Sequence, residues 1–525
     1  MLLPTLLALA TNFSPAPQDT PHALQETAPL SAESVLSADD LTADLALLRR
    51  ALTEVHPGLL RYGTKAELDA RFDALAEHWK TPRSLRVAYL ALSELLASFR
   101  CGHTYANFFN QSDAVRAALF DSAPCLPFAF RWIDGEMIVT RSASKEARLS
   151  PGVRILSIDG RPCAELRTRL LRLARADGGN DAKRLALLSV SGEEPYETFD
   201  VFFPLLFPPA IPSSFRLECE DLAGARFQVV APSMLATQRN ALLAERASST
   251  PKSLDAFTLA GWATSEPAPH VALLRMDTWV AYKTDADWRA ELDAFVDRIV
   301  AAETQHLIVD LRRNEGGNDC GSALLARLIE KPLTLPSTAR HVRCARTPEE
   351  LNAFLDTWDD TFRNWGEFAR PVERAPALLG EAGAFFRLRR DASDDPGAQL
   401  APSERPRLRA KLWVLVGPTN SSATFQFASA VQGAKLGVLV GAPTGGNQRG
   451  INGGAFFFLR LPRTGLEVDL PLIAYTPCDA QGREIDGVPD AGLTPDIVVR
   501  TTRAEIAADA DPELRAVLAA IASGR

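Results

Sequence analysis

The sequence lacks the surplus of basic residues that nucleic-acid binding requires. Its 57 Lys and Arg are outnumbered by 65 Asp and Glu, which gives a net charge of -8 at pH 7, and no long Lys/Arg run occurs. A protein that binds nucleic acid normally presents a basic patch or stripe. We therefore expect no nucleic-acid partner.

Long apolar runs are also missing beyond the N-terminus. No later stretch approaches the ~20 apolar residues with which a helix crosses a bilayer, so we expect no transmembrane span. The first residues contain a short apolar stretch, Leu2–Ala10, and Ala8-Leu9-Ala10 resembles a signal-peptidase site, although no Lys or Arg precedes it. An export signal and an apolar tail both stay open, and we expect an exported, periplasmic or extracellular protein.

Cysteine is scarce and scattered. The seven cysteines form no CxxC pair and show no metal-ligand spacing; they are Cys101, Cys125, Cys163, Cys219, Cys320, Cys344 and Cys478. An odd, dispersed set argues against a disulfide framework and against a zinc site. We expect few or no structural disulfides and no metal.

A helical region follows the leader and its Pro-, Ser- and Thr-rich linker, residues 1–36. In residues 37–55 a Ser/Asp cap precedes apolar residues three and four positions apart, which predicts a helix with one buried face. These residues are Leu41, Leu45, Leu48, Leu52 and Val55. Further helices are predicted at 65–78 and 85–99, so residues 37–115 are expected to form a helical N-terminal domain.

Residues 116–235 are predicted to be rich in strands. LPFAFRWIDGEMIVT, residues 126–140, indicates a hairpin that turns at Asp134-Gly135. LSPGVRILSIDGRPCAELRTRLL, residues 149–171, predicts a strand, a tight turn and a helix. This unit resembles part of a PDZ-like domain, and an ordinary strand–turn–helix unit has a similar pattern.

From residue 255 to 510 strands and helices alternate, which is typical of a buried sheet in an α/β protein. The predicted elements are strands at 270–276, 306–312, 411–416 and 435–441, and helices at 286–302 and from Ser422 onward. Residues 454–475 indicate a hairpin, and residues 341–408 interrupt the alternation as an inserted lid or flap. The expected fold class is a multidomain α/β protein.

Two adjacent serines occur where a strand turns into a helix, in GPTNSSATFQFA, residues 417–428. Serine is a favoured helix N-cap because its oxygen accepts hydrogen bonds from free backbone N–H groups. A serine at a helix start also lies where such N–H groups can hold an oxyanion. A cap and a nucleophile are both open from this stretch alone.

Three other motifs carry polar groups that catalysis uses. DLRRNEGGN, residues 310–318, ends a strand in a Gly-Gly pair that allows close backbone approach to a ligand, or is an ordinary loop. CGHTYANF, residues 101–108, offers His103, or a structural histidine. DGVPDAGLTPDIVV, residues 486–499, offers Asp490, with Glu484 just before it, or is a turn-rich strand entry.

DLRRNEGG, NSSATFQFA, VGAPTGGNQ and GLTPDI, in this order, resemble the C-terminal-processing serine peptidases and their tricorn-like relatives. The resemblance runs from about residue 35 to 500 and is densest after residue 268. It implies a crotonase-like ββα-spiral core joined to a PDZ-like domain, a peptide or protein substrate, and no cofactor.

The same resemblance implies roles for individual residues. The family nucleophile stands six residues before the last Ala of its motif, and counting back from Ala428 gives Ser422. The oxyanion hole is implied to use the N–H of Ala423 together with Gly316 or Gly317.

The chain departs from the processing branch at the base. Asn447 stands where that branch has a lysine, and an asparagine cannot take a proton at neutral pH. His103 is the implied base, as in the tricorn-like branch, although Gly102 stands where that branch has a serine. The acid is implied to be Asp490 or Glu484, and Asn447 is a candidate for binding substrate or orienting the histidine.

The sequence therefore predicts a serine peptidase in which Ser422 attacks, His103 accepts the proton and an acid orients the imidazole. Activity is expected to fall as the pH drops through ~6.5, the reference value for imidazole. The alternative is a catalytically inactive relative of the same fold that binds a ligand or peptide. An acyl-CoA enzyme of the crotonase type would leave the helical and PDZ-like regions without a role.

Overall fold

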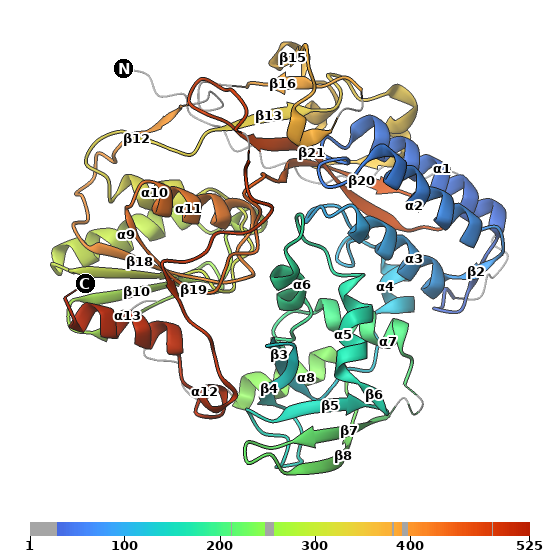
Figure 1. The fold of residues 1–525 in the computed structure, drawn as a ribbon, viewed down its shortest axis with the longest axis horizontal. Coiled ribbons are helices and arrows are strands. Elements are labelled where there is room, and N and C mark those ends of the chain that lie inside the picture. The colour runs from blue at the N-terminus through green and yellow to red at the C-terminus, as the bar shows by residue number, and fades with distance from the viewer. Residues whose placement is uncertain are drawn as a thin grey trace.

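The computed structural model describes residues 29–209, 211, 213–246, 257–380, 383–390, 397–485 and 487–524. The expected export signal at Leu2–Ala10 and most of the linker lie outside these residues. Four parts are arranged around the molecule in Figure 1, with α6 near the middle of the view. They are N-terminal helices, a strand-rich region, an α/β sheet and a second, antiparallel sheet.

The N-terminal part is helical, as the spacing of its apolar residues predicts. Its helices are α1 (Ala38–Val55), α2 (Lys65–His78), α3 (Leu85–Ser98) and α4 (Asp113–Leu119), and the short strands β1 (Val35–Leu36) and β2 (Arg83–Ser84) pair beside them. Ser37 caps α1 by accepting a hydrogen bond from the N–H of Asp40. The predicted apolar face of α1 is buried.

The strand-rich part is an antiparallel sheet with helices against it. Its strands are β3 (Phe128–Ile133), β4 (Glu136–Ser142), β5 (Arg154–Ile158), β6 (Arg161–Pro162), β7 (Ser214–Glu220) and β8 (Arg226–Pro232). Its helices are α5 (Cys163–Leu171), α6 (Asp181–Leu187), α7 (Thr198–Leu206) and α8 (Ala236–Arg246). The predicted hairpin is confirmed: Asp134 and Gly135 both have positive φ, as a tight two-residue turn needs.

The α/β sheet has the strand order β22-β19-β18-β11-β10-β9 and is parallel except for β9. Its strands are β9 (Trp262–Ala268), β10 (Val271–Met276), β11 (His306–Asp310), β18 (Lys411–Val416), β19 (Gly437–Gly441) and β22 (Ile497–Val498). Its helices are η1 (Ala281–Lys283), α9 (Trp288–Ala301), α10 (Cys320–Ala326), α11 (Ser422–Gly433), α12 (Arg503–Ala507) and α13 (Pro512–Ala522).

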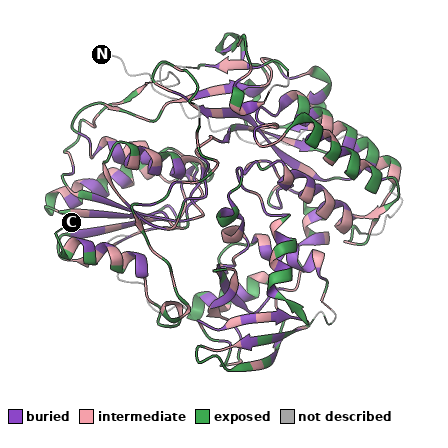
Figure 2. Ribbon diagram, in the orientation of Figure 1, coloured by how far each residue is buried: buried purple, intermediate pink, exposed green. Residues whose placement is uncertain are grey.

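The central strands of this sheet, β10, β11, β18 and β19, are covered on both faces, which is why they are largely apolar. One apolar cluster joins it to α9, α10 and α11, and another joins its opposite face to α13. Figure 2 shows these strands as largely buried. Because β11 and β18 are parallel neighbours, the loops that follow them meet at one edge of the sheet.

The second sheet has the order β14-β20-β21-β13-β16-β15. Its strands are β13 (Thr338–Val342), β14 (Leu355–Asp356), β15 (Ala369–Pro371), β16 (Phe386–Leu388), β20 (Asn452–Arg460) and β21 (Glu467–Pro477), and β12 (Leu333–Thr334) pairs with β17 (Gln399–Leu400). The short helices η2 (Glu349–Phe354), η3 (Asp360–Arg363), η4 (Gly366–Phe368) and η5 (Ala377–Leu379) connect them.

The described residues of 341–408 contribute β14, β15 and β16 to this sheet, and the interpretation of the whole segment as an inserted lid or flap stays a prediction. Their strands extend the predicted hairpin of β20 and β21 at both sides, because β13 pairs with β21 and β14 with β20. This sheet shares one apolar core with the N-terminal helices and the strand-rich part. The domain boundaries expected from the sequence stay predictions.

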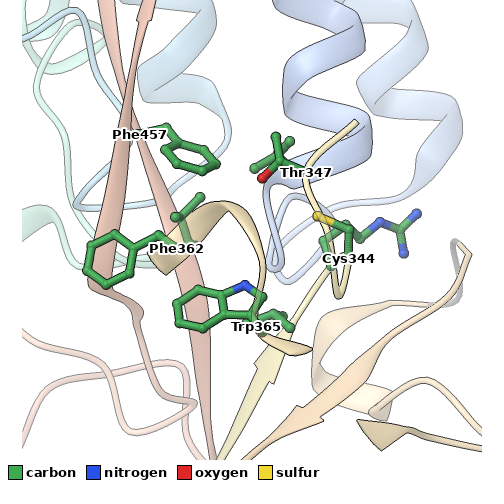
Figure 3. Close-up of a pocket in the computed structure, with 9 residues that line it drawn as sticks. Cys344, Thr347, Phe362, Trp365 and Phe457 are labelled. Carbon is green, nitrogen blue, oxygen red and sulfur yellow. The ribbon is translucent and has the colours of Figure 1, made fainter. Parts of the chain in front are cut away.

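Figure 3 shows the residues that line one small cavity in this shared core. The cavity drawn there measures about 10 Å³ and is lined by Thr347, Cys344, Phe362, Trp365 and Phe457, among others. A space of this size holds at most one water molecule. It is a packing gap in the core and not a ligand site.

In the part of the chain that the structure describes, no helix is both long enough and apolar enough to span a bilayer. All seven cysteines are free thiols.

Candidate active site

The two serines lie where β18 gives way to α11. We call residues 417–423 the serine turn. The side chain of Asn420 accepts a hydrogen bond from the N–H of Gly417 (2.7 Å) and donates one to the carbonyl of Asn314 (3.0 Å). The serine turn is thereby fixed against the loop that follows β11.

Ser421 is the N-cap residue of α11, but its side chain forms no capping hydrogen bond. Its hydroxyl donates to the carbonyl of Glu315 (3.2 Å) and accepts from the ammonium of Lys183 (3.2 Å). The residue is only 7% exposed. The capping interpretation is therefore wrong for Ser421, whose side chain is held inside the protein.

Ser422, the first residue of α11, has an unusual backbone. Its φ is 49°, in the left-handed region that residues other than glycine rarely adopt. Such a conformation costs on the order of 1–3 kcal/mol and occurs mainly at functional sites. The side chain is half-buried and forms no hydrogen bond within the described residues. Ser422 therefore has the strained backbone and the unengaged hydroxyl of a nucleophile.

The loop between β11 and α10 lies directly against Ser422. A Cβ atom on Gly316 would come within 2.8 Å of the Cβ of Ser422, and the φ of Gly316 is 120°, so only glycine fits there. The N–H of Gly316 already donates to the side chain of Asn314 (2.8 Å). The backbone N–H groups of Gly317 and Ala423 have no acceptor anywhere in the described chain. Two free donors thus border the serine from two different elements.

His103 follows α3 and reaches the end of β20. Its ring centroid lies 5.8 Å from that of Phe456. The Nδ1 atom is buried and has no hydrogen-bond partner among the described residues. Burial lowers the pKa of the imidazole, and the negative charge of Asp177 opposes part of this effect. The ring is therefore neutral at neutral pH, as a proton acceptor must be.

Residues 175–183, which run from the loop after α5 into the first turn of α6, bring polar groups to both His103 and the serine turn; we call them the connector. The carboxylate of Asp177 accepts a hydrogen bond from the N–H of Gly102 (2.9 Å). A Cβ atom on Gly102 would lie 2.7 Å from its other oxygen. The carboxylate thus takes the space of the serine side chain that the tricorn-like pattern has beside the histidine.

The connector also supplies two cations to one carboxylate. Arg175 donates to Glu315 (3.1 Å) and to the carbonyl of Gly102 (2.8 Å). Lys183 donates to Glu315 and to the carbonyl of Thr419 (2.8 Å). Burial alone would raise the pKa of Glu315, but the charges of Lys183 and Arg175 hold that pKa well below its usual range. Glu315 is therefore ionised and binds both cations.

Asn447 holds the connector from the other side. Its amide is fully buried and donates to the carbonyl of Asp177 (3.2 Å) and to the carboxylate of Asp490 (2.7 Å). Asp490 also accepts from the N–H of Gly179 (3.0 Å). These contacts place both residues against the connector backbone, where Asn447 orients the segment that carries Asp177.

Neither acid suggested by the resemblance has a hydrogen bond to His103 within the described residues. Asp490 lies behind the connector, and Glu484 accepts hydrogen bonds from the N–H of Ala377 in η5 (3.1 and 3.0 Å). Their role as the orienting acid stays a prediction.

The sequence patterns led to Ser422, Ala423, the Gly-Gly loop and His103, but not to the connector. Its sequence RADGGNDAK carries a signal that could have indicated it. Like the loop after β11, it places a Gly-Gly pair beside charged residues, and Asn180 then caps α6. What the pattern does not show is that Asp177 and Lys183 point inward, where they are 2% exposed.

This arrangement is suited to nucleophilic attack on a carbonyl. It combines an unengaged hydroxyl, one free N–H donor at the start of α11, another in the loop after β11, and a neutral imidazole close to the same group of charges. No group of three or more His, Cys, Asp or Glu side chains in the described residues is placed to hold a metal ion.

Part of the chain matches a family model, and its fold resembles those of solved structures. Residues 270–499 match the model of peptidase family S41. The fold resembles that of mature CPAF complexed with lactacystin, with a TM-score of 0.59 at 15% identity over 90% of this chain and 95% of that one. A second structure of mature CPAF gives a TM-score of 0.57 at 15% identity over 90% and 94%.

A photosystem II D1 C-terminal processing protease gives a TM-score of 0.37 at 15% identity over 87% of this chain and 92% of that one. No curated protein matches the chain. Residues 270–499, the part of the chain that matches the model of peptidase family S41, contain both the serine turn and the loop after β11.

Proposed function

We propose that the protein is a serine-type peptidase that cleaves peptide bonds through an acyl-enzyme on Ser422. One observation carries this proposal: Ser422 starts α11 in a strained conformation, pressed against Gly316 and bordered by the free N–H groups of Ala423 and Gly317. Such donors stabilise the negative charge that develops on a carbonyl oxygen under attack.

The reaction proceeds in two halves. The hydroxyl oxygen of Ser422 bonds to the peptide carbonyl carbon, and its proton passes to the imidazole of His103. The carbonyl oxygen becomes an oxyanion that accepts hydrogen bonds from Ala423 and Gly317. The C–N bond then breaks, and the amine leaves with the proton from His103. Water repeats the attack on the ester, which releases the acid and restores the serine.

His103 is favoured as the base over Lys183, which lies next to the serine turn, and over the more distant Lys411 and Lys435. Lys183 lies beside Ser421, but its ammonium donates to three acceptors, one of them the carboxylate of Glu315. Lys411 stands at the opposite end of β18 from the serine turn, and Lys435 follows the far end of α11. At position 447, where the processing branch has a lysine, this chain has Asn447, whose side chain donates a hydrogen bond to the connector.

Asp177 is the carboxylate best placed to steady the imidazolium that forms. It lies against Gly102, and its charge raises the pKa of His103 more than any other charge does. An anion near the imidazole stabilises the protonated form as the proton arrives. Asp490 and Glu484 remain the competing assignments.

The finer description of the fold is also a proposal. The alternation of strands and helices from β9 to β22 supports a crotonase-like core. The order of strand, turn and helix from β5 to α5 supports a PDZ-like character for the strand-rich part. The substrate is a peptide or protein.

The Leu2–Ala10 stretch supports export, so fractionation should recover a mature chain starting near Thr11 outside the cytoplasm. A cytoplasmic chain with Met1 intact would contradict this prediction.

Peptide hydrolysis by single-serine variants tests the proposal. Ser422→Ala should lose activity by several orders of magnitude, because a triad nucleophile accounts for on the order of 10⁶ in kcat. Ser421→Ala removes only positioning hydrogen bonds and should retain activity within about tenfold. His103→Ala should lose hydrolysis while keeping the fold. A folded wild-type protein that hydrolyses no peptide would favour the inactive binding relative.

A further inference from the structure

The two cations of the connector and the carboxylate of Glu315 form an ion triad between the parts of the site, in which the side chain of Lys183 is buried and that of Glu315 is partly exposed. We infer that the Arg175–Glu315–Lys183 triad is the device that positions the serine turn and the loop after β11 relative to His103. The inference rests on the proposed function and adds three positioning residues to it. None of the three is suggested by the sequence motifs.

The contacts form one continuous path. At one end Arg175 donates to the carbonyl of Gly102, the residue before His103 (2.8 Å). Glu315 accepts from Arg175 with one carboxylate oxygen (3.1 Å) and from Lys183 with the other. At the far end Lys183 donates to Thr419 and Ser421 of the serine turn (2.8 and 3.2 Å).

Glu315 makes two contacts that hold the loop after β11 against the connector and the serine turn. Its side chain receives Lys183, and its backbone carbonyl receives the hydroxyl of Ser421 (3.2 Å). The next residue is Gly316, which touches Ser422, and then Gly317, whose N–H is free. A displacement of Glu315 would therefore move the proposed oxyanion donors and the nucleophile relative to each other.

Lys183 is fully committed to these contacts. Its side chain is 2% exposed, and its three N–H donors are matched by the acceptors on Glu315, Thr419 and Ser421. Removal of a buried partner leaves the remaining charge uncompensated, so the neighbouring groups must move. In an active site a shift of about 1 Å can lower the rate on the order of 100-fold.

The triad lies next to the serine turn, and a similar set of ion pairs, formed by Arg327, lies away from it. Comparing the two separates positioning of the serine from general stabilisation of the fold. Arg327 forms a comparable pair of ion bridges elsewhere in the same sheet unit. Its side chain is also 2% exposed, and it binds Asp293 (2.6 Å) and Asp297 (2.5 Å), which are 32% and 39% exposed. Glu315 is 40% exposed, so the two settings match in burial. Arg327 ends α10, and its two partners lie on α9, away from the serine turn.

The path also indicates that Lys183 positions the serine and does not take its proton. Its ammonium faces Ser421 and not Ser422, and all its protons are engaged. Burial lowers the pKa of this lysine, but Glu315 opposes that effect and favours the ammonium. An arginine keeps the positive charge of a lysine but cannot accept a proton. An arginine can therefore replace a lysine that positions the serine, but not a lysine that acts as the base.

The experiment measures phosphonylation of the folded protein by a fluorophosphonate probe, together with kcat, KM and the pH dependence of kcat/KM for a peptide. The variants are Lys183→Met, Lys183→Arg and Glu315→Gln, with Arg327→Met as the matched control. We expect Lys183→Met and Glu315→Gln to phosphonylate on the order of 100-fold more slowly. Their KM should stay within about threefold. The acid limb should move to higher pH in Lys183→Met and to lower pH in Glu315→Gln, because the charge of Lys183 lowers the pKa of His103 and the charge of Glu315 raises it. Lys183→Arg should recover part of the rate.

The control separates stability from positioning. Arg327→Met should lower the melting temperature as much as Lys183→Met does, but its folded fraction should react at the wild-type rate. If Lys183→Met does not fold, the nearly isosteric Glu315→Gln variant decides between the two outcomes. Wild-type rates in Lys183→Met or Glu315→Gln would overturn the inference. So would a Lys183→Arg variant as slow as Lys183→Met with a displaced acid limb, since Lys183 would then be the base. A wild-type protein that does not react with the probe at all would overturn the proposed function itself.

Discussion

Two neighbouring serines in this chain have opposite environments. Ser421 is buried and bound on both sides, by Lys183 and by the carbonyl of Glu315. Ser422 has an unengaged hydroxyl and a backbone in the left-handed region. The difference arises because α11 begins between them, so successive side chains leave the turn in different directions. Only Ser422 is free to act on a substrate.

The lowered pKa of His103 gives a prediction for the pH dependence of activity. A base must be neutral to accept a proton, so kcat/KM should fall as His103 becomes protonated. Because burial lowers the pKa of this imidazole, the acid limb should lie below ~6.5, the reference value. Measuring kcat/KM from about pH 4 to 8, with circular dichroism as a check on folding, tests this. A midpoint above the reference value would contradict the assignment.

A second prediction decides which carboxylate supports His103. Asp177→Asn keeps a hydrogen-bond acceptor for the N–H of Gly102 but removes the charge. Since that charge raises the pKa of His103, its loss should move the acid limb to lower pH and reduce kcat by between about 10-fold and 10⁴-fold. Asp490→Asn and Glu484→Gln, the matched carboxylate controls, should leave the limb in place. If the limb moved in Asp490→Asn or Glu484→Gln instead, the corresponding carboxylate would be the acid.

The residues that the sequence could identify are those marked by local chemistry. Ser422, Gly316 and His103 stand in short motifs whose residue types have a direct physical use. Asp177 and Lys183 do not, because their function comes from partners far away in the chain; Lys183 meets Ser421 across 238 positions. No local pattern reports such a contact.

Among the secondary-structure elements, the parallel sheet was the most predictable part. Four of its strands, β10, β11, β18 and β19, are short apolar runs between helices, and the sequence predicts them. The strands at its two edges, β9 and β22, were not predicted, because β9 is partly polar and β22 has only two residues. The second sheet was less predictable. The hairpin of β20 and β21 is evident from the sequence, but its partners β13, β14 and β16 are short strands among loops. Strands of two to five residues are too short to show a clear alternation of apolar and polar residues, so the sequence of this segment indicated a lid.

The segment from β13 to β17 nevertheless reaches the site. Trp358 is 61% exposed, and its ring centroid lies 5.7 Å from that of Phe456, which is itself 5.8 Å from His103. An exposed indole beside the base offers apolar surface to a bound peptide. An aromatic contact contributes about 0.5–1.5 kcal/mol, so Trp358→Ala should raise KM between about twofold and tenfold. The value of kcat should change little.

Phe368→Ala is the control for this prediction. Phe368 is an aromatic residue of the same segment and is 43% exposed. The Phe368→Ala variant should leave KM unchanged. Both variants should unfold within a few degrees of the wild type, because exposed side chains contribute little to stability. An unchanged KM in Trp358→Ala would show that the substrate lies elsewhere.

In the whole molecule, the site is assembled from parts that are distant in the chain. The base comes from the N-terminal helical part, the connector from the strand-rich part, and the nucleophile from the α/β sheet. The connector joins them through hydrogen bonds to Gly102, beside the base, and to Ser421, beside the nucleophile. The sequence predicted that His103 and Ser422 belong to different regions. The α/β sheet that carries Ser422 packs in apolar clusters of its own, so its orientation relative to His103 depends on polar contacts such as those of the two connector cations, which no sequence motif specifies.

The central claim is that Ser422 is the nucleophile, and the most direct measurement is the location of a covalent adduct. The wild-type protein is treated with a fluorophosphonate, its intact mass is measured, and the modified residue is mapped by fragmentation. One adduct per chain is expected, on Ser422, and it should be absent in Ser422→Ala and present in Ser421→Ala. An adduct on Ser421, or a folded wild-type protein that gains no mass, would contradict the account.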